Sequence, residues 1–216
     1  MESGAPFADR AAAGLELATR LRRYAGRDDA IVLAIPRGGV PVGFEIARTL
    51  GLPLDVVLVR KLGVPGREEL AMGALATTGY AHIDRWIVDR LEIKQPEIDS
   101  VLARERRELE RRERAYRGDR PPPQIRDRIV ICVDDGLATG ASMRVAVEAL
   151  REGKPAKIVV AVPVAAAQIA LEMRAFADEV VVARMPDRFR AVSVWYRNFS
   201  QTTDAEVREL LARAAS

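Results

Sequence analysis

The fold is decided by residues 129–142, which read Ile-Val-Ile-Cys-Val-Asp-Asp-Gly-Leu-Ala-Thr-Gly-Ala-Ser. A continuous apolar run of strand length ends at two adjacent acids, Asp134 and Asp135, and a loop of small and hydroxyl-bearing residues follows. A helical pattern begins directly after that loop. Helix N-termini offer unpaired N–H groups to anions, and ligands of parallel sheets collect at the carboxyl ends of strands. The stretch therefore predicts a phosphate-binding loop. The acids would repel phosphate, so we expect them to face ribose hydroxyls or a divalent cation.

Apolar runs of strand length alternate with helical patterns on both sides of this stretch. The expected strands are residues 31–35, 54–59, 128–133, 157–162 and 179–183, and the expected helices are 8–24, 40–50, 140–152 and 165–176. Such alternation indicates a parallel sheet covered by helices on both faces. Cys132 lies within one of these strands and is expected to fill the core.

The region between the second and third predicted strands has a different character. Residues 62–70 are rich in glycine and proline and predict a mobile loop. Residues 71–77 and 80–83 predict strands around a turn at Thr78-Gly79.

Residues 96–117 predict a long helix dense in Arg and Glu. Leu102, Leu109 and Tyr116 recur every seven residues and give this helix a thin apolar seam. Two interpretations stay open: an exposed helix laced by weak ion pairs, or a helix that pairs with a second copy in a homodimer.

The C-terminal part ends the alternation. Residues 185–203 carry four aromatic side chains, and a capping-box pattern at Thr203 predicts a last helix over 204–214. The whole pattern fits one domain over residues 1–216, with a core over about 30–183.

The composition excludes several classes of protein. With 49% hydrophobic and 30% charged residues, the 216-residue chain can bury a core and is not expected to be disordered. A net charge of +3 is too small to indicate a nucleic-acid partner. A single cysteine excludes an internal disulfide and a multi-cysteine zinc site, and a single histidine disfavours His-based metal clusters and Ser-His or Cys-His catalysis within the chain. Without a signal-type N-terminus or an apolar run of membrane-spanning length, a cytoplasmic protein with no membrane partner is expected.

Residues 129–142 resemble the signature of the type I phosphoribosyltransferases: four apolar residues, two acids, three variable residues, Thr-Gly, one variable residue, then Ser or Thr. The resemblance implies a Rossmann-like parallel sheet flanked by helices, and 5-phosphoribosyl 1-diphosphate as substrate. It also implies that Asp134 and Asp135 are catalytic, with Mg²⁺ held near them by the ligand's pyrophosphate and ribose hydroxyls. The residues implied to bind the 5′-phosphate and ribose are Asp134, Asp135, Gly136, Leu137, Ala138, Thr139, Gly140, Ala141 and Ser142.

Two other interpretations of the acids are weaker. They could begin an ordinary turn and cap a helix. They could also form a receiver-type phospho-acceptor pocket, but the separate aspartate and lysine at strand ends that such a pocket needs are missing.

Residues 34–39 are positioned like the pyrophosphate-binding loop of this family. The resemblance implies that Arg37, Gly38 and Gly39 bind pyrophosphate, and it predicts a cis peptide bond between Pro36 and Arg37. The alternative is an ordinary Gly-Gly turn.

Arg60 and Lys61 resemble the Arg-Lys pair that several members place before their catalytic loop. The resemblance implies that both bind pyrophosphate and act in catalysis by balancing its charge, with residues 62–70 as a lid. That loop departs from the family pattern, since it holds one arginine beside two glutamates where orotate-type enzymes carry several cations. The alternative is a plain strand terminus.

Residues 185–203 are placed like the hood that stacks on the base in hypoxanthine-guanine members, and Phe189 is the implied stacking residue. Ala138 instead resembles adenine-type members, so the acceptor stays open. Trp195 and Tyr196 fit a core or an interface equally well.

Together these features predict a pentosyltransferase that uses 5-phosphoribosyl 1-diphosphate and Mg²⁺ to attach phosphoribose to a nitrogen of a nucleobase-like acceptor. The alternative is a catalytically silent regulatory protein that binds phosphoribosyl diphosphate or a nucleotide. RNA binding through residues 96–117 is disfavoured, because acids interleave with the arginines there. The expected partners are small-molecule substrates, and a homodimer if the seam pairs across copies.

Overall fold

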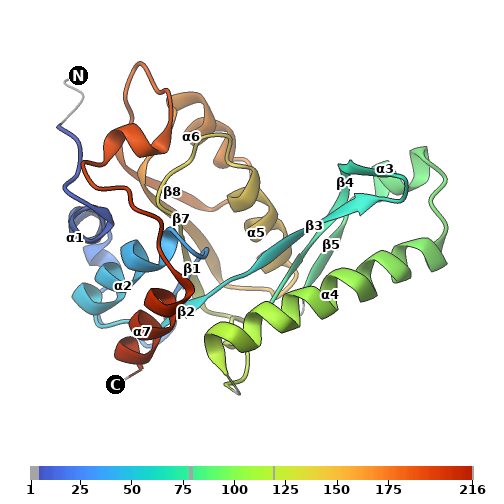
Figure 1. Ribbon diagram of the computed structural model, residues 1–216, viewed down its shortest axis with the longest axis horizontal. Coiled ribbons are helices and arrows are strands. Elements are labelled where there is room, and N and C mark those ends of the chain that lie inside the picture. Colours follow the sequence, from blue (N-terminus) through green and yellow to red (C-terminus); the bar gives the residue numbers. More distant parts are fainter. Residues whose placement is uncertain (1–4, 78–79, 119, 216) are drawn as a thin grey trace.

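The computed structural model describes residues 5–77, 80–118 and 120–215, and the turn predicted at Thr78-Gly79 lies outside them. Within the described residues the chain forms a body built on a parallel sheet, and a unit with an antiparallel sheet projects from this body (Figure 1).

The body is the predicted parallel sheet. Its five strands lie in the order β2-β1-β6-β7-β8, and every neighbouring pair is parallel. The strands are β1 (Ala30–Ala34), β2 (Leu54–Val56), β6 (Ile129–Val133), β7 (Lys157–Val164) and β8 (Glu179–Arg184). All residues of β1 and β6 are buried, as is typical of central strands covered on both faces. The predicted α/β fold is therefore confirmed.

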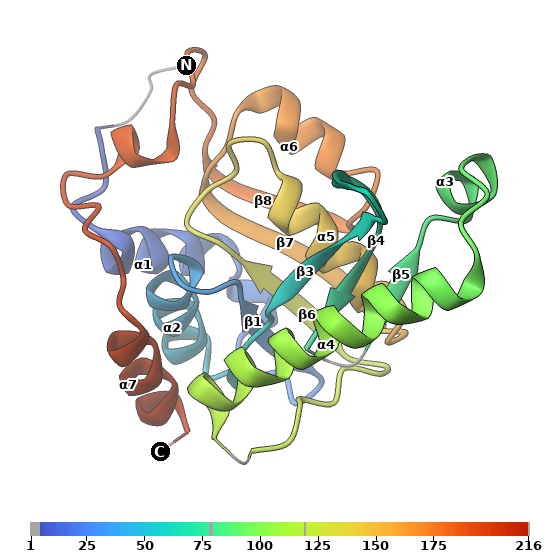
Figure 2. The same cartoon turned by 45° about the vertical axis from the view of Figure 1, so that its right-hand side comes forward.

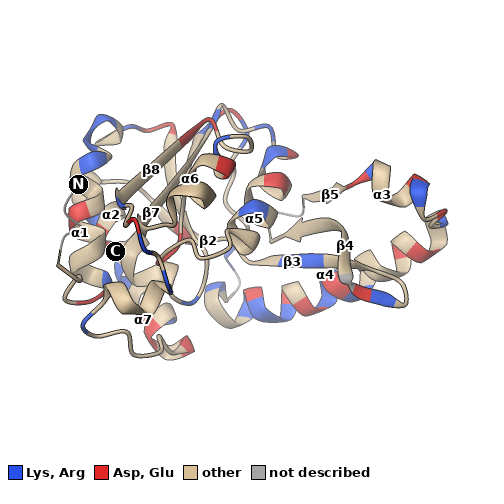
Figure 3. Ribbon diagram, turned by 90° about the horizontal axis from the view of Figure 1, so that it is seen from above, with Lys and Arg blue, Asp and Glu red and all other residues tan. Residues whose placement is uncertain are grey.

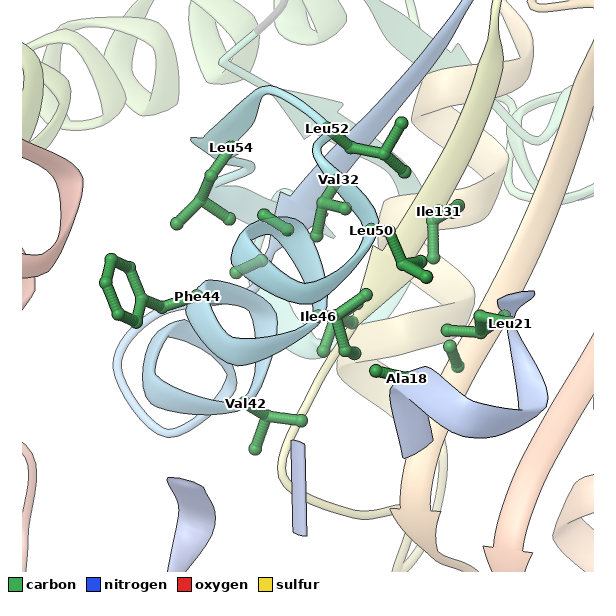
Figure 4. Close-up of a cluster of buried hydrophobic side chains, with 14 of the residues drawn as sticks. Ala18, Leu21, Val32, Val42, Phe44, Ile46, Leu50, Leu52, Leu54 and Ile131 are labelled. Atoms are coloured by element: carbon green, nitrogen blue, oxygen red, sulfur yellow. The ribbon is translucent and has the colours of Figure 1, made fainter. Parts of the chain in front are cut away.

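Helices cover both faces of this sheet. One face is covered by α1 (Arg10–Arg20), α2 (Gly39–Leu50) and α7 (Asp204–Ala214), and the other by α5 (Ala141–Arg151) and α6 (Ala167–Met173). Val32 and Ile131 point into the first layer, where Ile46 and Leu50 of α2 meet them (Figure 4). The neighbouring Leu33 and the predicted core residue Cys132 point into the second layer, because successive strand residues alternate between faces. Short 3₁₀ helices lie at Arg22–Tyr24 and Val192–Trp195.

The projecting unit comprises residues 59–117, and we call it the arm (Figure 2). It contains an antiparallel sheet in the order β3-β4-β5, made of Val59–Val64, Arg67–Ala76 and Ala81–Ile83. A short helix α3 (Arg85–Arg90), which the sequence pattern did not indicate, leads into the long α4 (Gln95–Arg117).

The irregular loop predicted at 62–70 is wrong, because these residues form the turn and the adjoining parts of a β-hairpin made by β3 and β4, and the predicted mobility of this segment stays a prediction. The glycines and the proline occupy special positions within it. Pro65 and Gly66 make the turn, and Gly63 lies at a shift of the strand register. A Cβ at Gly63 would lie 2.6 Å from the carbonyl oxygen of Glu68, so this crossing requires glycine. Leu62 and Val64 beside it are buried, which supplies the apolar packing that a loop would lack.

The seam of α4 packs within the chain. Ile98, Val101 and Leu109 are buried against Met72 and Leu75 of β4, while Leu102 and Tyr116 are partly buried in the same cluster. The opposite side of β4 presents alanines to the body. The helix is therefore neither fully solvated nor free to use its seam for pairing with a second copy, and the seam gives no support to the expected homodimer.

Replacing Leu109 with alanine should lower the free energy of unfolding by about 2–4 kcal/mol, because it leaves a cavity beneath α4. Urea denaturation measures this loss. The control is Arg107→Ala on the exposed side of the same helix, which should change stability by less than about 0.5 kcal/mol. A loss that depends on protein concentration would show instead that the seam joins two copies.

Candidate functional site

The predicted acids and the predicted pyrophosphate loop meet at one edge of the sheet. β1 and β6 are parallel neighbours with Ala34 opposite Val133, so their carboxyl ends lie side by side. The pairing continues past the strand ends, where the amide of Ile35 donates to the carbonyl oxygen of Val133 at 2.8 Å. Residues 36–39 are thereby held against the acid pair, Asp134 and Asp135.

The loop after β1 has the backbone that the resemblance predicted. The Pro36–Arg37 peptide bond is cis, and α2 begins two residues later at Gly39. A Cβ at Gly38 would overlap the carboxylate of Asp135, and one at Gly39 would lie 2.6 Å from the carbonyl oxygen of Val133. Glycine is thus required at both positions, since any side chain would push the loop away from the acids.

The loop from Gly136 to Ser142 leads from the acid pair into α5. Leu137 is anchored in the core, with its amide donating to the carbonyl oxygen of Val164 at 2.9 Å. Gly140 adopts φ 72° at the N-cap of α5 and has no side chain to cap the helix, and the amide of Ala141 donates to the Thr139 hydroxyl at 3.4 Å. Ala138, Thr139, Ala141 and Ser142 are exposed. The start of α5 therefore presents amides and two hydroxyls to the surface, an arrangement suited to an anion.

The two acids have unusual protonation properties. Burial raises the pKa of Asp134 well above its ordinary value, and the neighbouring charge of Asp135 raises it further. Burial also raises the pKa of Asp135, but Arg10 opposes this through a hydrogen bond and its charge. The amide of Asp135 donates to Oδ1 of Asp134 at 2.8 Å. The pair resembles two carboxylates that share a poorly solvated site and resist ionising together.

Arg10 is a site residue that the sequence did not reveal. Its Nε and Nη2 lie 2.9 and 2.8 Å from Oδ2 of Asp135, and only 11% of its side chain is exposed. Arg10 precedes Asp135 by 125 positions, and no motif surrounds it, so no local pattern could have linked the two.

The hood, residues 185–203, lies over the acid pair, and a segment near residue 7 pairs with it. The Tyr196 hydroxyl donates to the carbonyl oxygen of Asp135 at 2.6 Å, and Val192 covers Gly136. Phe7 forms a bridge with Tyr196, and its amide donates to the carbonyl oxygen of Trp195 at 2.9 Å. Tyr196 is 5% exposed, so of its two interpretations the core position is confirmed.

Phe189 is half-buried against the same apolar cluster as Phe7 and Tyr196. Its stacking on a base stays a prediction.

The predicted pyrophosphate cations have partners elsewhere. Arg60 binds Glu105 of α4 through Nη2 at 2.6 Å, and Lys61 is exposed, on the opposite side of β3 as strand alternation requires. Arg37 lies 3.9 Å from Asp204 at the start of α7. It lines a cavity of about 370 Å³ with Arg111 and other residues of α4. The structure thus joins Gly38 and Gly39 to the acid pair, but pairs Arg37 and Arg60 with α7 and α4.

Among the described residues, no group of three or more His, Cys, Asp or Glu side chains is arranged to hold a metal ion. None of the described helices is both long and apolar enough to span a membrane.

Comparison with known proteins gives a consistent result. The model of the phosphoribosyl transferase domain family matches residues 7–194. Two Mycobacterium tuberculosis proteins, from strains CDC 1551 and H37Rv and each named "Putative phosphoribosyl transferase", are 42% identical over 208 residues, 96% of this chain. The chain spans about half of their length, 47%. The crystal structure of TT1426 from Thermus thermophilus is 40% identical and superposes with a TM-score of 0.86, and the match covers 98% of this chain and 100% of that one.

The raised pKa of Asp134 predicts a specific pH dependence of stability. A carboxyl whose pKa is higher in the folded state stabilises the fold fully at low pH, and that contribution is lost as the pH rises through the folded-state pKa. Asp134→Asn removes this loss. The unfolding free energy of the variant, relative to the parent, should therefore increase as the pH rises from about 4 to about 8.

Urea denaturation across that pH range measures the difference. The exposed Asp187→Asn removes one negative charge elsewhere and serves as the control for net charge. A difference between Asp134→Asn and the parent that does not change with pH would contradict the assignment of a poorly solvated acid pair.

Proposed function

Because the chain belongs to the phosphoribosyl transferase domain family, we propose that it transfers phosphoribose from 5-phosphoribosyl 1-diphosphate, with Mg²⁺, to a ring nitrogen of a nucleobase-like acceptor. One observation carries the proposal. Two adjacent acids, a loop in which two glycines are required and a helix N-terminus with a glycine at its N-cap converge at the carboxyl ends of β1 and β6.

Each part has a defined task in this reaction. The amides and hydroxyls of residues 136–142 bind the 5′-phosphate and fix the orientation of the sugar. Asp134 and Asp135 accept hydrogen bonds from the ribose hydroxyls, and the negative charge of Asp135, which Arg10 stabilises, favours the positive charge that develops on the sugar. The backbone of residues 37–39 binds the pyrophosphate. The bond from ribose C1 to the pyrophosphate oxygen breaks, a bond from C1 to the acceptor nitrogen forms, and the proton of that nitrogen leaves to solvent.

The donor set fits a Mg²⁺ that arrives with the substrate. Asp134 and Asp135 are the two carboxylates at this edge, and Arg10 already binds one of them. Oxygens of the pyrophosphate and of the ribose would supply the remaining ligands, since Mg²⁺ favours substrate phosphates and water over an all-protein cage. When bound, the ion would neutralise charge on the leaving pyrophosphate.

In this proposal Arg37, Arg60 and Lys61 balance the charge of the leaving group. For Arg60 this requires exchanging Glu105 for pyrophosphate, and for Arg37 it requires loosening its contact with Asp204. These two pairings are the observation that favours the second candidate, a regulatory protein that binds the same ligand without turning it over.

The acceptor is the least constrained part. Ala138 is exposed in the 136–142 loop and brings no carboxylate to the base, and the half-buried Phe189 is the proposed stacking residue.

Pyrophosphate release from 5-phosphoribosyl 1-diphosphate and Mg²⁺, screened against a panel of nucleobases, tests the proposal. Release should occur with at least one base, and Asp135→Asn should lower kcat/KM by on the order of 100-fold, because the developing sugar charge loses its closest anion. Thr139→Val with Ser142→Ala should mainly raise KM for the phosphoribosyl substrate.

Arg107→Ala, on the exposed side of α4, is the matched control and should behave as the parent. Tight binding of the phosphoribosyl ligand without release for any base would favour the regulatory protein. A protein that neither binds nor reacts would refute both candidates.

A further inference from the structure

The placement of Arg10 is fixed by two anchors close to it in the chain. Phe7 and Ala8 pair with the hood through hydrogen bonds from Arg197 and Asn198 to their carbonyl oxygens, at 2.8 and 3.0 Å. Asp9 then caps α1, accepting from the amide of Ala12 at 2.8 Å. Arg10 is therefore the first residue of α1, directly after a segment that the hood already holds.

The guanidinium of Arg10 connects three groups at once. Besides its two bonds to Oδ2 of Asp135, its Nη1 donates to the carbonyl oxygen of Ser200 at 2.7 Å. The Cζ atom of Arg10 lies over the ring of Phe199, 3.9 Å from the ring centroid. A planar fork of donors with an apolar face can serve a carboxylate, a carbonyl and an aromatic ring together, whereas an ammonium group cannot.

The contact determines where the carboxylate of Asp135 lies. Oδ2 is held by Arg10 on one side, and the loop at Gly38 approaches so closely on another that a Cβ there would overlap it. The carbonyl oxygen of Asp135 also accepts a hydrogen bond from the Tyr196 hydroxyl of the hood. Its side chain and its backbone are thus fixed by residues from both ends of the described chain.

We propose that Arg10 is a positioning residue for the ribose: it orients Asp135 toward the ribose hydroxyls and ties the hood to that orientation. The inference rests on the proposed function, because it assigns the diol of a phosphoribosyl ligand to Asp135. Arg10 lies outside the signature segment, residues 129–142, so recognition of the sugar would also depend on the placement of residues 7–10.

The competing explanation is that Arg10 only pins the N-terminal segment to the hood. The chain offers a matched control for this. Arg184 stacks on Phe7 at 3.6 Å, binds Glu16 of α1 at 2.7 Å and donates to the carbonyl oxygen of Ala5. These three contacts all lie outside the acid pair, and they hold the N-terminal segment to the end of β8, beside Phe7 in the aromatic cluster of Phe7, Tyr196 and Phe199.

Calorimetric binding of ribose 5-phosphate, 2-deoxyribose 5-phosphate and inorganic phosphate tests the inference. The parent should prefer ribose 5-phosphate over both other ligands. Arg10→Met should lower the affinity for ribose 5-phosphate roughly tenfold or more, because Asp135 loses a charged hydrogen-bond partner. The affinity of this variant for ribose 5-phosphate should then be close to its affinity for 2-deoxyribose 5-phosphate. Inorganic phosphate should bind Arg10→Met as it binds the parent, and Arg184→Met should keep the preference for ribose. In an Asp135→Asn background, Arg10→Met should have little further effect.

Arg10→Lys carries the test if Arg10→Met does not fold, as judged by circular dichroism, and should show an intermediate loss. Equal ribose preference in the parent and the Arg10 variants would overturn the inference and leave the proposed function intact. Parallel loss of all three ligands in the Arg10 and Arg184 variants would also overturn it, in favour of the structural pin. A parent that binds ribose 5-phosphate no better than phosphate would refute the proposed function, and the inference with it.

Discussion

The parallel pairing of β1 with β6 is the constraint on which the site depends. It continues one residue beyond β1, where the amide of Ile35 donates to the carbonyl oxygen of Val133 at the end of β6, and so fixes the distance between the loops that follow. At that distance only glycine fits at positions 38 and 39, and the two acids lose much of their contact with water. The backbone geometry of the sheet edge thus sets both the chemistry of the carboxylates and the composition of the loop facing them.

Features that depend on short segments could be predicted from the sequence. The strand, acids, loop and helix of residues 129–142 follow one another with no distant partner required, and Thr203 caps α7 as its pattern indicates. The alternation of apolar strands and helices was sufficient to predict a parallel sheet with helices on both faces. The cis peptide bond between Pro36 and Arg37 was accessible only through the family resemblance.

Features that depend on contacts between distant segments could not be predicted. The glycines and proline of residues 62–70 are as compatible with a loop as with a bulged hairpin. Only the burial of this segment against α4 distinguishes the two structures. Arg10 looks like any arginine at a helix start. Tyr196 carries no local sign that its hydroxyl binds the backbone of Asp135.

The long charged helix combines surface and interior roles. Positive and negative residues are interspersed along α4 (Figure 3), and Glu108 forms surface ion pairs with Arg111 and Arg112. Two charged side chains instead face inward, where Arg117 binds Asp55 of β2 at 2.7 Å and Glu105 binds Arg60. Burial raises the pKa of Glu105, whereas hydrogen bonds from Arg60 and Arg104 lower it, and the net value lies below the ordinary one. A buried carboxylate that has lost its partner is costly, so moving Arg60 toward a ligand leaves Glu105 dependent on Arg104.

The acid pair is covered by residues 7–10 and by residues 192–200, which are far apart in the sequence and lie side by side in the fold (Figure 1). A segment held by few contacts can open locally while the rest of the fold stays intact. Here, peeling residues 7–10 away would uncover the aspartates at the same moment. Such an opening would break the contact between Arg10 and Asp135 and the pairing of Phe7 with Tyr196, and it would not require the strands of the sheet beneath to separate.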